Sequence, residues 1–154
     1  MTIPSIALFG IMIPILSTIG HGIGFLPALI ALILYSQLPI IRNTYTGIRD
    51  VDPDIRDAAK GIGMTTFQRL WKVEIPNAMP LIMAGIRTAT VLNIGIGAIA
   101  AYIGAGGIGS LINQGISRSN NTMVLVGAVV VSVLAIIADL FFKYIQRKFT
   151  PKSN

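Results

Sequence analysis

Four stretches of bilayer length, almost free of charged residues, constrain this chain more than any other feature. A hydrocarbon core of roughly 30 Å is crossed by about 20 helical residues, so each stretch predicts a transmembrane helix. The four lie near residues 3–19, 23–41, 80–103 and 122–142. Hydrophobic residues make up 53% of the 154 residues and charged residues only 12%. The sequence therefore predicts an all-α, polytopic membrane protein with about four transmembrane helices, in a single transmembrane domain over 1–154.

The basic residues indicate how the chain is oriented. They gather in the connection 42–78 and in the C-terminal tail, as Arg42, Arg49, Arg56, Lys60, Arg69, Lys72, Lys143, Arg147, Lys148 and Lys152. The other two connections hold only Arg118 between them. Because basic loops stay on the cytoplasmic side, we expect loop 42–78 and the C-terminus to be cytoplasmic. The net charge of +6 then reflects orientation, and we expect no nucleic-acid partner.

The sequence lacks the residue sets that catalysis or metal binding would need. It contains no cysteine and a single histidine, His21, so we expect no metal site. It also has no phosphate-binding loop and no nucleophile beside a base. We therefore expect a non-catalytic protein without a cofactor of its own.

Two short amphipathic helices are predicted inside the connection 42–78. Asp52 suits a helix cap and Pro53 a first helical position, and Gly61 and Gly63 then end the helix. Thr65 begins a second helix, because Gln68 follows it at the spacing of a capping box. We expect Pro76 to end this second helix.

The surface of this connection has two interpretations that the residues alone leave open. In the first, the helices lie on the membrane with Arg69 and Trp71 at the lipid interface. In the second, the first helix docks in the groove of a partner protein, because Ala58 and Ala59 leave little side chain in the way.

The third stretch and the turn after it are rich in glycine. The glycines are Gly95, Gly97, Gly104, Gly106, Gly107 and Gly109. Such residues let neighbouring helices approach closely, or let the backbone bend where it lines a cavity. Two roles carry equal weight for these glycines. One is helix packing, and the other is a gate or hinge, which would lie at Gly95, Gly97, Gly104, Gly106 and Gly107.

Two ionisable residues, Arg87 and Asp139, fall within the predicted spans. Charge at depth in a bilayer is unfavourable, so each needs a partner or a route to water. Asp139 could pair with Lys143 one turn later while Arg87 reaches the interface. Alternatively, Arg87 and Asp139 pair with each other and tie the third span to the fourth.

The connection also resembles a known motif. Asp57, Ala58 and Ala59, then Gly63, then Ile75 and Pro76, match in spacing the "EAA" loop of type I ABC importer permeases. The segments "LPIIRNTYTGI", "VDPDIRDAAKGIGM", "VEIPNAMPLIMAGIRTATVLNIG" and "AAYIGAGGIG" are similar to permeases for the osmoprotectants glycine betaine, carnitine and choline. Asp57 departs from the usual glutamate, which brings its carboxylate one methylene closer to the backbone.

The resemblance implies a permease subunit of the bacterial cytoplasmic (inner) membrane in which this loop couples to a separate ATPase. Asp57, Ala58, Ala59, Gly63 and Pro76 would form the coupling site, and ATP would be bound by the partner. The other implied partners are an extracytoplasmic substrate-binding protein and a second permease subunit, as a homodimer. Such permeases commonly carry a further membrane helix before the region matching Ile3, so the resemblance implies that N-terminal helix or helices are lacking.

Three alternatives to this function stay open on the sequence. The same loop serves permeases for methionine or another small solute, and a truncated membrane anchor would bind an ATPase without transport.

A quaternary ammonium is usually bound in an aromatic cage, but Tyr35, Tyr45 and Tyr102 are too scattered to define one. The substrate-binding residues are therefore not predicted.

Overall fold

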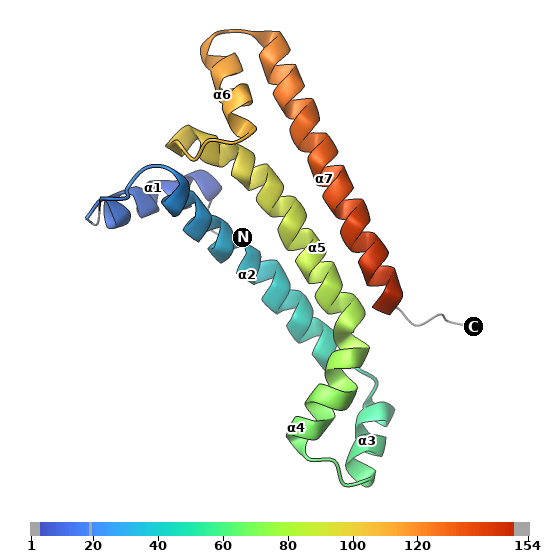
Figure 1. The fold of residues 1–154 in the computed structure, drawn as a ribbon. Helices are drawn as coiled ribbons and strands as arrows, with labels where there is room; N and C mark the ends of the chain where they lie inside the picture. The colour runs from blue at the N-terminus through green and yellow to red at the C-terminus, as the bar shows by residue number, and fades with distance from the viewer. Residues whose placement is uncertain (1–3, 19, 150–154) are drawn as a thin grey trace.

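The computed structural model describes residues 4–18 and 20–149, and every regular element within them is helical (Figure 1). In chain order these elements are α1 (Ser5–Ser17), α2 (Phe25–Arg49), α3 (Pro53–Gly61), α4 (Thr66–Arg69), the π-helical turn η1 (Leu70–Glu74), α5 (Ile75–Ile99), the 3-10 turn η2 (Ala100–Ile103), α6 (Gly109–Ser117) and α7 (Asn121–Phe149). The predicted all-α class is confirmed.

The three long helices lie side by side with α5 in the middle (Figure 1). Within the described residues, three stretches are long and apolar enough to cross a membrane: Phe25–Arg49, Thr66–Ile103 and Asn121–Phe149. The predicted span 3–19 is not among these three. Its helix, α1, has 13 residues and is only about 20 Å long. Residues 3 and 19 of that predicted span lie outside the described part.

The helix α1 crosses the N-terminal part of α2 instead of running alongside it (Figure 1). Its Phe9 is 2% exposed and packs in a cluster with Ala28 and Ala31 of α2 and Ala100 of η2. Alanines leave room for the ring, so this contact fixes α1 across the end of the bundle. The chain reverses between α1 and α2 at Gly20 and Gly24, whose positive φ angles of 78° and 112° glycine adopts without strain.

Close approach of backbones holds α2 against α5. A Cβ atom built on Gly85 would lie 2.9 Å from the carbonyl oxygen of Pro39, and one on Gly47 would lie 3.2 Å from that of Ala78. Spanning helices gain little from the hydrophobic effect in lipid and associate through such van der Waals contact. The large apolar side chains instead face outward along all three long helices.

The expectation that Pro76 ends the second loop helix is wrong. The chain stays helical from Thr66 to Ile103, and Pro76 is the second residue of α5. Immediately before it, the N–H of Ile75 donates to the carbonyl of Leu70, five residues back, in the π-helical turn. The wider turn lets the helix continue through a residue that lacks an N–H and would otherwise interrupt it.

Candidate functional site

The loop helix α3 is formed by the local signals that the sequence predicted. The side chain of Asp52 accepts from the N–H of Asp54 at 2.9 Å, and Pro53 occupies the first turn. The helix ends at Gly61, and Gly63 takes a left-handed φ of 80° while its N–H donates to the carbonyl of Lys60 at 2.9 Å. α3 is thus a separate nine-residue helix at one end of the bundle (Figure 1).

The second loop helix, α4, begins with the predicted capping box, which is confirmed. The Thr65 N–H donates to the side-chain oxygen of Gln68 at 3.0 Å, and the Gln68 N–H donates to the Thr65 hydroxyl at 3.3 Å. The next turns carry Phe67 and Trp71, whose rings lie 6.1 Å apart, centre to centre. These side chains are 70% and 58% exposed, so an apolar aromatic pair stands uncovered beside α3.

The motif residues divide into exposed and buried positions. Asp57, Ala58, Gly63 and Pro76 are exposed, whereas Ala59 is 5% exposed and packs inside the chain. The coupling role of these residues stays a prediction, and the exposed ones are those that offer their side chains to a partner. Asp57 accepts a hydrogen bond from Lys60 at 2.8 Å, which lowers the pKa of its carboxyl and keeps it ionised further into the acid range.

A cluster of charges that sequence reasoning missed joins the loop to the long helices. The carboxylate of Glu74 is the single buried charged side chain among the described residues, at 7% exposure. Arg69 of α4 donates to it at 2.8 Å, and Arg56 of α3 lies 3.6 Å from the same oxygen. Arg56 also donates to the carbonyls of Ile48 and Arg49 at the end of α2. We call Arg56, Glu74 and Arg69 the loop ion cluster.

One signal in the sequence could have pointed to Glu74. It is the only acidic residue between Asp57 and Asp139, and it lies among apolar residues just before the proline. A lone carboxylate in such a place requires a cationic partner. Which arginine supplies it depends on the π-helical turn and on the fold of α3, neither of which the spacing reveals.

Within the bundle, the structure brings Arg87 and Asp139 together across α5 and α7. The Nε and Nη2 atoms of Arg87 donate to the two carboxylate oxygens of Asp139 at 2.5 and 2.7 Å. The two side chains are 30% and 33% exposed. Near the same end, the Gln146 amide donates to the Pro80 carbonyl at 3.1 Å, so the two helices are fixed in register. The sequence left two pairings open for Asp139, one with Lys143 and one with Arg87. The structure has the pairing with Arg87.

The charge pair also marks a level along the bundle. From Asp139 back to Asn121, α7 carries no charge over eighteen residues, about 27 Å of helix, which is close to the thickness of a hydrocarbon core. Trp71 lies sixteen residues before Arg87 along the continuous helix, about 24 Å beyond that level. The headgroup layer is only about 5–8 Å deep on each side. A hydrocarbon core that ends at the charge pair would leave the aromatic pair outside the lipid, as the partner-docking interpretation of the loop requires.

The candidate hinge glycines fall into two kinds. Gly104, Gly106 and Gly107 have φ angles of 75–78° and form the break between η2 and α6. Gly95 and Gly97 lie within α5 with open space where a Cβ would stand, so neither packs a neighbouring helix closely in this chain. The close contact lies instead at Gly109, where a Cβ would be 2.1 Å from the carbonyl oxygen of Ala98.

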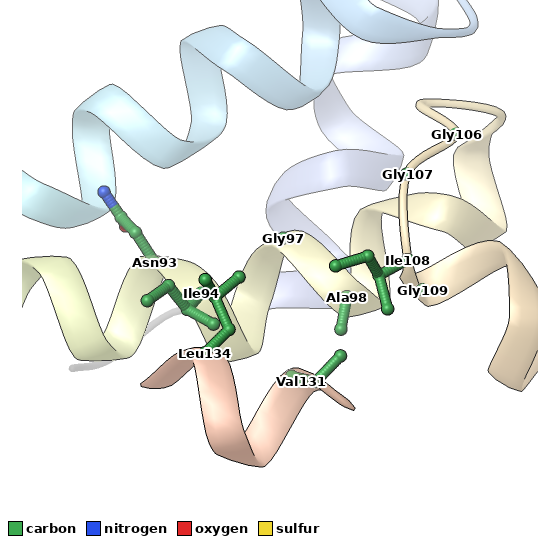
Figure 2. A pocket seen from close by; sticks show the side chains of 10 residues that line it. All are labelled: Asn93, Ile94, Gly97, Ala98, Gly106, Gly107, Ile108, Gly109, Val131 and Leu134. Atoms are coloured by element: carbon green, nitrogen blue, oxygen red, sulfur yellow. The ribbon is translucent and has the colours of Figure 1, made fainter. Parts of the chain in front are cut away.

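A pocket of about 160 Å³ lies beside this break (Figure 2). It is lined by α5, by the glycine turn and by α7, and Ile94, Val131 and Leu134 give it an apolar wall. The side chain of Asn93 points away from Val131 and Leu134 in this view, and its Oδ1 atom is buried without a hydrogen-bond partner in the described part of the chain. Apart from Asn93 its lining residues are apolar or glycine, so the pocket offers no set of polar groups for a solute.

Comparisons with known proteins agree with this arrangement. The family model described as "binding-protein-dependent transport system inner membrane component" matches residues 1–151. The osmoprotectant import permease protein OsmW of Salmonella typhimurium is 57% identical over 152 residues, which cover 99% of this chain and 71% of that protein. The glycine betaine/carnitine/choline transport system permease protein OpuCB of Bacillus subtilis is 46% identical, over 98% and 67% of the two chains.

The fold is also similar to that of a solved transporter. The match is to inward-facing conformations of the MetNI methionine ABC transporter, with a TM-score of 0.88 and 25% identity, covering 97% of this chain and 70% of that one. The family model spans nearly the whole chain, and the apolar helices are long enough to cross a bilayer more than once. The chain is therefore a multi-pass membrane protein that belongs to the family of binding-protein-dependent transport system inner membrane components.

Proposed function

We propose that this chain is the permease subunit of an ATP-driven importer for osmoprotectants of the glycine betaine, carnitine and choline class. The observation that carries the proposal is identity of 45–57%, over nearly the whole chain, to permeases named for these solutes. The subunit is non-catalytic: it forms the translocation path, and a separate ATPase binds and hydrolyses ATP. Substrate recognition rests largely on an extracytoplasmic binding protein, and the permease works as a homodimer.

In this proposal, loop 42–78 and the C-terminus face the cytoplasm. The support is the gathering of basic residues at this end of the bundle. The exposed residues Asp57, Ala58 and Gly63 then meet the ATPase, as a short helix seated in a groove. Transport follows from two packings of the long helices whose balance the docked ATPase shifts.

The substrate class is tested by uptake. Cells without endogenous osmoprotectant uptake are given this chain with the ATPase and the binding protein encoded in the same genome. We expect accumulation of radiolabelled glycine betaine, carnitine or choline that stops when ATP is depleted, and no accumulation of methionine. Methionine uptake would favour the solute class of the structurally similar MetNI transporter, and no uptake of any solute would favour an anchor without transport.

The aromatic pair provides a prediction for the ATPase contact. Because Phe67 and Trp71 form an exposed apolar pair beside α3, we expect them to be covered by the docked ATPase. Trp71→Ala should weaken binding of the ATPase about tenfold or more, as truncation of a buried interface aromatic does. Tyr102→Ala is the matched control, since Tyr102 is also 58% exposed but follows α5 at its opposite end. Equal affinity of both variants, measured with purified subunits in detergent, would place the aromatic pair outside the interface.

A further inference from the structure

The helix α3 has little apolar packing of its own. Ala59 is its only buried residue, and the larger apolar side chain on it, Ile55, is 41% exposed. Its two ends are a short connection at 50–52 and the glycine turn at 62–65. A helix held only in this way would move independently of the bundle, because few buried contacts fix it.

The loop ion cluster supplies the missing connection. Arg56 extends from α3 to the last carbonyls of α2, where a helix leaves acceptors unpaired and favours a cation. The same guanidinium lies 3.6 Å from the carboxylate of Glu74, which stands at the junction of η1 and α5. Arg69 donates to the same carboxylate oxygen at 2.8 Å. Three elements, α2, α3 and the start of α5, thus meet at one charge cluster.

We propose that Glu74 is the positioning residue through which movement of α3 reaches the two long helices α2 and α5. This inference rests on the proposed function, because it assigns the transmission step of the same coupling loop. Glu74 does not touch the ATPase or the solute. It is buried, and its negative charge keeps two arginines from different helices at one point. When the ATPase displaces α3, the ends of α2 and α5 move with it, because the loop ion cluster connects them to α3.

The test compares Glu74→Gln with the wild type in the assembled complex. The glutamine keeps the size and one acceptor but removes the charge, which leaves two arginines facing each other without a counter-charge. We expect ATPase binding and ATP hydrolysis to be retained, because the exposed face of α3 is unchanged, while solute imported per ATP hydrolysed falls about tenfold. Hydrogen exchange of the backbone N–H groups of α3 should become faster by a similar factor.

Asp50→Asn is the matched control, because it removes the same charge from a pair in the same loop. Asp50 accepts from Arg49 at 2.8 Å, but both side chains are more than half exposed. This variant should match the wild type in exchange and in solute imported per ATP, since exposed ion pairs contribute little.

Two results would overturn the assignment. One is an unchanged ratio of solute to ATP in Glu74→Gln, whatever the exchange shows. The other is a parallel fall in binding, hydrolysis and uptake, which would make Glu74 a residue of general stability. Absence of ATP-driven uptake in the wild type would contradict the proposed function itself and this transmission role with it. Hydrogen exchange within 53–61 would still report whether the cluster holds α3.

Discussion

Replacing Asp139 with leucine is expected to lower the free energy of unfolding of the detergent-solubilised chain. The change leaves the Arg87 guanidinium between α5 and α7 without the carboxylate that accepts both of its hydrogen bonds. Breaking a fully buried pair costs roughly 3–5 kcal/mol. The expected loss is smaller because about a third of each side chain is exposed. Denaturant unfolding followed by tryptophan fluorescence of Trp71 measures the difference.

The double variant Arg87→Leu with Asp139→Leu separates charge from packing. Removing both partners leaves no unpaired charge, so most of the lost stability should return. The exchanged pair, Arg87→Asp with Asp139→Arg, should also be more stable than either single reversal. If the double variant is as unstable as the sum of the single variants, the pair does not hold α5 to α7.

Replacing Gly109 with valine should have the largest structural effect. The Cβ would lie 2.1 Å from the carbonyl oxygen of Ala98 and 2.7 Å from its Cα atom, far inside van der Waals contact. The atoms that clash belong to the backbone of α5, so no side-chain rotation relieves the overlap, and the start of α6 must move away. We expect a loss of at least about 3 kcal/mol, measured as a lower unfolding temperature and less monodisperse protein on gel filtration.

Gly95→Ala is the control for this glycine. Gly95 lies inside α5, has no positive φ, and has no atom of a neighbouring element within 4 Å of the place that a Cβ would take. Alanine there should raise stability by up to about 1 kcal/mol through its better helix propensity. A Gly109→Val protein as stable as Gly95→Ala would mean that α6 does not pack against α5 as described.

Local chemistry made much of the loop predictable. The capping residues Asp52, Thr65 and Gln68 and the left-handed Gly63 each act within four residues of the chain, so the ends of α3 and the start of α4 follow from spacing. The prediction that Pro76 ends a helix was wrong because the effect of a proline depends on the turn that precedes it. A proline usually interrupts a helix, but a π-helical turn just before it allows the helix to continue.

Contacts between distant segments were less accessible to sequence reasoning. The six glycines between 95 and 109 look alike in sequence, yet among these only Gly109 sits tightly against another backbone, because helix rotation decides which glycine faces a neighbour. The Arg87 to Asp139 pair was foreseeable as an alternative, since two charges in spanning helices need partners. Glu74 was missed because its partners come from two other elements of the loop.

Binding of the ATPase to α3 and α4 decides whether this loop couples the permease to ATP hydrolysis. Gly63→Pro is compared with Gly61→Ala by co-purification from detergent. Gly63 has a φ of 80°, which proline cannot adopt, and proline would also lose the hydrogen bond from its N–H to Lys60. Gly61 has open space and no positive φ, so alanine should be tolerated.

We expect Gly61→Ala and wild type to bring down the ATPase equally, whereas Gly63→Pro should retain less than about a tenth of it. Circular dichroism and gel filtration of each variant verify that the spanning helices remain folded. Full binding by a folded Gly63→Pro protein would contradict the coupling role of the loop, because α3 and α4 would then not form the surface on which the ATPase docks.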